Sequence, residues 1–140
     1  MNKTSRVPLQ MLGQSGCKLQ FPNCNIYLDP YLSNSVQELD SPDIERLQPI
    51  PFLPESVTDA DKVLITHEHI DHCDPHTIPK LAKASKQATF ICPQPVYDKL
   101  IEWGIDESRI ILASEVWTEL DKNLSLLAIP AAHPDIVRDK

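Results

Sequence analysis

THEHIDH, residues 66–72, places three imidazoles and two carboxylates within seven positions of a chain that has five histidines in all. Protonated side by side, the rings would repel one another, and buried without partners they would be costly to remove from water. A shared metal ion solves both problems, because neutral imidazole nitrogens and carboxylate oxygens are common ligands of divalent metals. The stretch therefore predicts a metal site.

The chain that leads into this stretch predicts where the site lies in the fold. Residues 63–65, Val-Leu-Ile, form a short continuous apolar run that is typical of a strand covered on both faces. Side chains alternate along an extended chain, so His67 and His69 can reach one cation. Asp71 and His72 lie where the chain turns toward the next helix and can face a second position. We expect the loop at the carboxyl end of a strand, where open α/β sheets place their ligand sites.

A third nitrogen is expected from His133, which ends the apolar run LSLLAIPAAH at residues 124–133. Two strands that deliver imidazoles from their carboxyl ends are predicted to be neighbours in one sheet. His76 is the other remaining histidine, but Pro75 separates it from the cluster and no suitably placed glutamate accompanies it. We interpret His76 as a surface or helix-entry residue.

Length and composition indicate one globular domain over residues 1–140. The sequence is 41% hydrophobic and 24% charged, which is ordinary for such a domain. A net charge of −7 argues against a nucleic-acid partner, which would need a basic stripe. No apolar run has the length of a signal peptide or a membrane span, so we expect a cytoplasmic protein with no membrane partner and with reduced cysteines.

Apolar runs and turn residues predict an α/β fold with helices outside a sheet. Residues 33–56 contain four prolines and little periodicity, and they are predicted to form a long loop with one short helix around Asp43–Leu47. Such loops are usually functional or mobile, and an inert surface excursion is the alternative. Strands are expected at residues 9–12, 18–21, 25–30, 63–65, 88–93, 109–113, 115–120 and 124–133, with the third ending at Asp29-Pro30. Helices are expected at 95–104 and from either Asp74-Pro75 or Pro79.

THEHIDH resembles the HxHxDH signature of the metallo-β-lactamase fold superfamily. The phrases LDPYLS at 28–33, LITHEHIDHCDPHTI at 64–78 and IPAAH at 129–133 are similar to the lactonase branch that contains L-ascorbate-6-phosphate lactonase. The resemblance runs from about Gln10 to His133. It implies the N-terminal half of an αββα sandwich, with a mixed sheet, outer helices, and one or two metal ions at the sheet edge.

The resemblance also implies roles for individual residues. Asp71 would orient the nucleophile and take its proton, in addition to binding metal. Asp29 matches an aspartate that braces the metal loop, and an ordinary Asp-Pro turn is the alternative reading. Three histidines would bind the first metal and an Asp–His pair the second, namely His67, His69 and His133, and Asp71 with His72.

The activity implied by the resemblance is metal-dependent hydrolysis of an ester-like bond in a small molecule, such as a lactone or a phosphorylated sugar-acid derivative, with Zn or Mn. Family members continue beyond the third histidine to an aspartate that bridges both metals and a last histidine, whereas this sequence ends seven residues after His133. We therefore expect a homo-oligomer or a chain that needs its missing C-terminal half. Two alternatives stay open: a non-catalytic metal-binding or partner-binding fragment, and a redox di-iron protein. The redox di-iron relatives usually have a carboxylate at the position of His69, so the imidazole favours hydrolysis.

Overall fold

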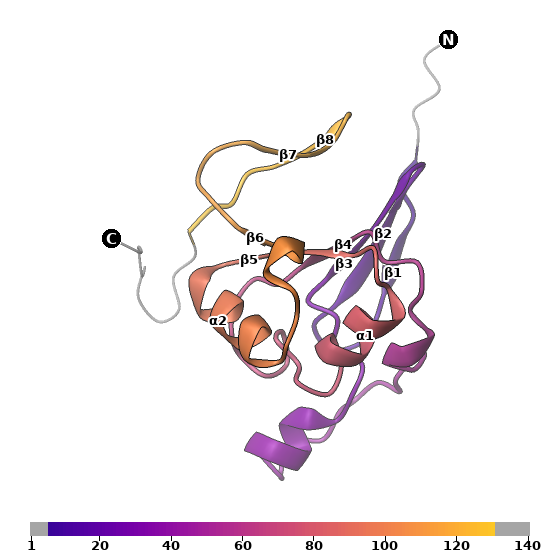
Figure 1. The fold of residues 1–140 in the computed structure, drawn as a ribbon. Coiled ribbons are helices and arrows are strands. Elements are labelled where there is room, and N and C mark those ends of the chain that lie inside the picture. The colour runs from indigo at the N-terminus through magenta and orange to yellow at the C-terminus, as the bar shows by residue number, and fades with distance from the viewer. Residues whose placement is uncertain (1–5, 131–140) are drawn as a thin grey trace.

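The computed structural model describes residues 6–130, in which six strands form one mixed sheet in the order β1-β2-β3-β4-β5-β6 (Figure 1). The first three strands pair antiparallel, and β3 to β6 pair parallel. A separate hairpin, β7–β8, forms a second sheet. The strands are β1 (Leu9–Met11), β2 (Cys17–Phe21), β3 (Cys24–Leu28), β4 (Lys62–Leu64), β5 (Thr89–Cys92), β6 (Ile110–Leu112), β7 (Thr118–Asp121) and β8 (Leu124–Leu126).

Two α-helices lie on the same side of the sheet in Figure 1, and the β7–β8 hairpin lies on the other. This arrangement confirms the predicted α/β class and agrees with half of the expected sandwich. No helix in residues 6–130 is both long and apolar enough to cross a membrane. The helices are α1 (Ile78–Ala84), α2 (Gln94–Glu102), the π-helix η1 (Val36–Asp40), and the 3-10 helices η2 (Pro54–Ser56) and η3 (Glu107–Arg109).

The core lies between the sheet and the helices. Tyr27, Val63 and Phe90 stand in register on three adjacent strands, and all three are buried. Side chains alternate along a strand, so one row of cross-strand partners faces the same layer. Apolar side chains of the two α-helices complete this core, namely Ile78, Leu81 and Ala82 of α1 and Val96 and Leu100 of α2.

The opposite face of the sheet is also apolar but less covered. Leu28, Leu64, Ile91 and Ile111 form the adjacent cross-strand row, in which Ile91 is buried and the other three are half-buried. Strands with apolar side chains on both faces are typical of sheets covered on both sides. This row therefore offers apolar surface for a further layer.

The prediction of a short helix around Asp43–Leu47 is wrong. The short helices of the 33–56 loop are η1, at Val36–Asp40, and η2, at Pro54–Ser56, and residues 43–47 are not helical. Arg46 accounts for the difference, because its guanidinium donates to the backbone oxygens of Leu12 (2.8 Å) and Tyr31 (2.8 Å) and so holds its segment against distant parts of the chain. Tertiary contacts of this kind override the weak local preference of a short segment.

The prediction that the last strand neighbours β4 is wrong within the described residues. β8 ends at Leu126 and pairs with β7, its partner across a short turn, in a separate sheet. Both edges of β4 are already occupied by β3 and β5. His133 lies outside the described residues.

Candidate metal centre

The loop 66–72 follows β4 and meets the end of β3 at the same edge of the sheet. Asp29, the residue after β3, donates its backbone N–H to the oxygen of Leu64 (2.8 Å), which is the last residue of β4. Ile65 continues the ladder by donating to the oxygen of Ile91 (3.0 Å). Parallel pairing thus brings Asp29 beside Thr66, although the two are 37 positions apart.

Asp29 is the hub of a polar network beneath this loop. Its side chain is buried, with the residue 4% exposed. One carboxylate oxygen accepts the backbone N–H of Thr66 (2.7 Å), and the other accepts the Thr66 hydroxyl (2.8 Å) and lies 2.8 Å from Nδ1 of His72. Asp29 also has a φ of +43°, a conformation that costs most residues energy but that Asp tolerates.

These hydrogen bonds fix the tautomers of two histidines. A carboxylate can only accept, so Nδ1 of His72 carries the proton and leaves the lone pair on Nε2. The single hydroxyl proton of Thr66 is directed to Asp29, so Nδ1 of His67, 2.9 Å away, donates to the Thr66 oxygen. His67 therefore also keeps its lone pair on Nε2. Both rings are set in the form that ligates a metal.

The three imidazoles of the loop are in contact. The ring centroid of His67 lies 4.7 Å from that of His69, edge to face, and 4.1 Å from that of His72. Burial lowers the pKa of His67, and the neighbouring His72 and His69 lower it further. Because its ordinary pKa is about 6.5, the lowered pKa keeps His67 neutral at pH 7, as ligation requires.

Asp71 faces the cluster and contacts the β1–β2 turn. Its Oδ2 lies 3.4 Å from Nε2 of His72 and accepts the hydroxyl of Ser15 (3.2 Å). Gly16, in the same turn, packs closely against the end of β3, where a Cβ would lie 2.5 Å from the backbone oxygen of Asp29. Ser15 was not among the site residues predicted from the sequence. The glycines at positions 13 and 16 predicted a turn around Ser15, but they did not indicate that this turn contacts Asp71.

The loop is also anchored from behind. The backbone N–H groups of His72 and Cys73 both donate to the oxygen of His69 (2.9 and 2.7 Å), which forms a tight turn. Lys99 of α2 donates to the oxygen of Glu68 (2.8 Å). These contacts hold the backbone of the cluster to the helix layer.

Asp74, which follows the loop, joins it to the segment after β3. This fully buried carboxylate accepts the Ser33 hydroxyl (2.7 Å), the backbone N–H of His76 (2.9 Å) and the hydroxyl of Thr77. Asp74 is therefore not the N-cap of α1, which begins at Ile78 with a proline in its first turn. The predicted start near Pro79 is the closer of the two.

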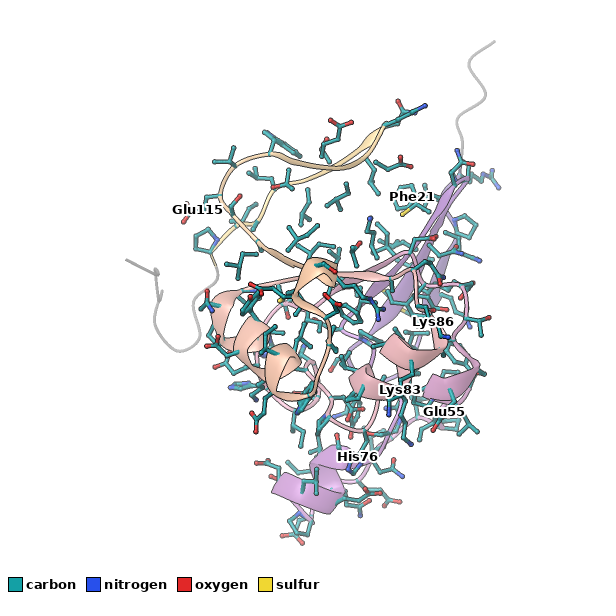
Figure 2. The ribbon with its side chains drawn as sticks, in the orientation of Figure 1. Phe21, Glu55, His76, Lys83, Lys86 and Glu115 are labelled. Atoms are coloured by element: carbon teal, nitrogen blue, oxygen red, sulfur yellow. The ribbon has the colours of Figure 1, made fainter. Side chains whose placement is uncertain are left out.

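His76 lies outside the imidazole cluster. Its Nδ1 is 3.1 Å from Oε2 of Glu38 in η1, and both side chains are largely exposed. Figure 2 shows His76 above η1, at the lower end of the molecule in this view.

The donors of the loop suit a divalent metal in kind, because imidazole nitrogens in the ligating tautomer stand beside a carboxylate. As the side chains stand, no three His, Cys, Asp or Glu residues within 6–130 form a group that could hold a metal ion. Two of the rings, those of His67 and His72, already meet at 4.1 Å. The predicted ligand His133 belongs to the part of the chain that is not described. The donor set therefore fits a metal, and a complete coordination sphere requires additional or rearranged donors.

Comparison with known proteins places this geometry in a family. The Beta-lactamase superfamily domain matches residues 24–140. An uncharacterised protein of Mycobacterium tuberculosis H37Rv is 29% identical over 136 residues, which are 92% of this chain and 34% of that protein. A protein of Escherichia coli O127:H6 named "Probable L-ascorbate-6-phosphate lactonase UlaG" is 26% identical over 110 residues, which are 74% of this chain and 31% of that protein.

A solved structure shows the same fold. Igni18, described as a metallo hydrolase from the archaeon Ignicoccus hospitalis KIN4/I, superposes with a TM-score of 0.62 at 23% identity, covering 92% of this chain and 50% of that one. The chain spans about a third of the length of the curated relatives that it matches. With the family domain matched from β3 onward and the fold shared along most of its length, the chain belongs to the metallo-β-lactamase fold superfamily.

Proposed function

We propose that loop 66–72 binds a divalent metal, Zn or Mn, and that the chain supplies this centre to a metal-dependent hydrolase. The observation that carries the proposal is the network from Asp29 through Thr66, which sets His67 and His72 with their lone pairs on Nε2. A buried carboxylate that orients ligand histidines is typical of metal sites. His69, Asp71 and His133 would provide further donors.

The residues around the centre have separate tasks. When bound, a divalent metal lowers the pKa of a water ligand toward about 7 and so supplies hydroxide near neutral pH. The Asp71 carboxylate would orient the nucleophile and accept its proton. Ser15 donates to the same carboxylate (3.2 Å) and so fixes its orientation. Asp29 holds His72 and, through Thr66, His67 in place.

The substrate class that we propose is a small molecule with an ester-like bond, such as a lactone or a phosphorylated sugar-acid derivative. Similarity to a protein named as a lactonase supports this class. We expect slow turnover from the 140 residues alone, because the second metal position has only Asp71 and His72 among the proposed ligands. The test should therefore not depend on turnover.

Substitution with Co²⁺ provides such a test. The visible absorption of bound Co²⁺ reports its ligands, so a spectrum should appear on titration and change when a γ-lactone or its ring-opened hydroxy acid is added. Asp71→Asn should weaken the response to the hydroxy acid, and His76→Ala, outside the cluster, should leave it unchanged. A Co²⁺ spectrum that no lactone or hydroxy acid perturbs would contradict the proposed substrate class, and the absence of any spectrum would contradict the metal site.

A further inference from the structure

An open groove of about 740 Å³ lies between the β1–β2 turn and residues 43–48 of the long loop. Leu47 is 90% exposed and Ile44 is 52% exposed. These large apolar side chains do not pack in the core of the domain. A ligand that covers them would remove their apolar surface from water, which favours binding. Six side chains that line the groove are those of Gln14, Asp43, Ile44, Glu45, Leu47 and Gln48.

Arg46 fixes the far wall of this groove. Its guanidinium donates to the oxygens of Leu12, Tyr31 and Gln48 at 2.7 to 2.8 Å, and it stacks over the ring of Tyr31. A side chain at Gly13 could not coexist with this clamp, because a Cβ there would lie 2.2 Å from the guanidinium, and the φ of Gly13 is +105°. The loop segment is thus fastened to the turn and does not depend on a ligand for its position.

The β1–β2 turn connects the groove to the candidate metal centre. Gln14 lines the groove, and the next residue, Ser15, donates to Asp71. Adjacent Cα atoms are about 3.8 Å apart, so the same turn lines the groove and contacts Asp71 of the candidate centre. The groove is therefore placed to hold the part of a substrate that does not react.

The charge of the groove restricts the chemistry of the non-reacting part of a substrate that could bind there. Asp43 and Glu45 are exposed carboxylates on its wall, and within residues 6–130 no basic side chain lines it. Residues 33–56 contain five acidic residues and one basic residue, Arg46. The three N–H groups of Arg46 described above are directed to backbone oxygens, so this cation is committed to the loop itself.

We infer that the groove binds the apolar, neutral or cationic portion of an ester-type substrate and discriminates against anionic, including phosphorylated, groups. This inference rests on the proposed function and narrows its substrate class, away from the phosphorylated sugar-acid derivative and toward an uncharged lactone or ester. Ile44 and Leu47 supply contact area, the amides of Gln14 and Gln48 supply polar contacts, and the two carboxylates set the charge preference.

Three small esters that differ in charge test the inference: butyrylcholine (cationic), ethyl butyrate (neutral) and monoethyl succinate (anionic). Binding is followed by the chemical shifts of the Gln14 and Gln48 side-chain amides in ¹⁵N-labelled protein at low salt and pH 7. The cationic and neutral esters should shift these signals. Monoethyl succinate should bind about tenfold more weakly, as expected for an anion near two carboxylates.

Variants separate apolar contact from charge. Leu47→Ser should weaken binding of all three probes, whereas Leu53→Ser, which changes another exposed leucine of the same loop outside the groove, should not. The double variant Asp43→Asn, Glu45→Gln should abolish the preference against the anion.

Equal binding of the anion, shifts that avoid the groove, no binding of any probe, or an equal effect of Leu53→Ser would each overturn the inference. Metal content, measured on the same samples, reports separately on the proposed function. A chain without metal that still binds the esters in the groove would refute the hydrolase proposal and leave the charge preference intact.

Discussion

Replacing Asp29 with Asn changes one charged oxygen into an NH₂ group at the hub of the metal loop. The remaining oxygen can still accept the backbone N–H of Thr66. The NH₂ group cannot accept from the Thr66 hydroxyl or from Nδ1 of His72, which both bond the same carboxylate oxygen in the native protein. Asn tolerates the positive φ of position 29 as well as Asp does, so the backbone adds no further cost.

The expected loss follows from the two broken bonds. Hydrogen bonds to a charged group contribute about 1.5–3 kcal/mol each, and the lower figure applies to a partly buried network, so the free energy of unfolding should fall by about 3 kcal/mol. The tautomers of His67 and His72 would also no longer be fixed. Loss of a partner that orients metal ligands costs about 10- to 100-fold in metal affinity.

Urea unfolding of the metal-free protein measures the first effect, and Zn²⁺ titration measures the second. Asp59→Asn is a control, because Asp59 also accepts side-chain hydrogen bonds, here from Lys18, Asn25 and Tyr27, but precedes β4 at the opposite end of that strand. It should lose stability and keep its metal affinity. A stability loss below about 1 kcal/mol for Asp29→Asn, together with unchanged Zn²⁺ affinity, would refute the role assigned to the network.

Three further predictions concern the rest of the molecule. Arg46→Met removes the clamp on the long loop, so the free energy of unfolding should fall by about 2 kcal/mol or more in urea, and limited proteolysis should cut within residues 33–56; a resistant loop would show that the clamp is dispensable. Burial raises the pKa of Asp59, but hydrogen bonds from Lys18 and Tyr27 outweigh burial and hold that pKa below its ordinary value of 3.8. Their stabilisation is therefore present above the ordinary pKa and is lost as pH falls through the lowered pKa. Wild type and Asp59→Asn should differ in urea midpoint at pH 6, and the difference should shrink as pH falls below about 4. A constant difference would contradict this. The half-buried row on the second face of the sheet predicts self-association, which sedimentation should detect as a dimer or larger species, and a compact monomer with cooperative unfolding would contradict it.

The position of the candidate site could be predicted from the sequence because it depends on local pattern. The apolar run at 63–65 predicted a strand, and β4 occupies Lys62–Leu64. Alternation and a turn then predicted that the histidines of the loop would gather, and their rings lie 4.1 to 4.7 Å apart. Both the strand and the grouping of the histidines follow from residues 63–72 alone and do not depend on which distant segments lie beside the loop.

The supporting contacts of the site could not be predicted from local pattern, since they join distant positions, and only the family resemblance led us to expect Asp29 beside the metal loop. Ser15 meets Asp71 across 56 positions, and Asp29 meets His72 across 43. Both depend on how the fold brings distant segments of the chain together. The wrong helix around Asp43–Leu47 has the same origin, because the long-range bonds of Arg46 determine that segment.

Pairing of the last strand shows a second limit. Residues 124–133 are an apolar run that leads to a histidine, like the run that leads from β4 to His67. However, β8 pairs with β7, the strand that precedes it in the chain. Local hairpin closure requires little chain entropy, and the edges of β4 are taken by β3 and β5. A similar pattern of side chains therefore did not imply a neighbouring position in the sheet.

Metal content tests the central claim, that loop 66–72 is a metal centre, most directly. Purified protein is equilibrated with Zn²⁺ or Mn²⁺, freed of unbound metal by gel filtration, and analysed by inductively coupled plasma mass spectrometry for wild type, His67→Ala and His76→Ala. The account predicts at least one metal per chain in wild type, retention in His76→Ala, and loss in His67→Ala. A wild-type chain without metal, or a His67→Ala variant that keeps it, would contradict the account.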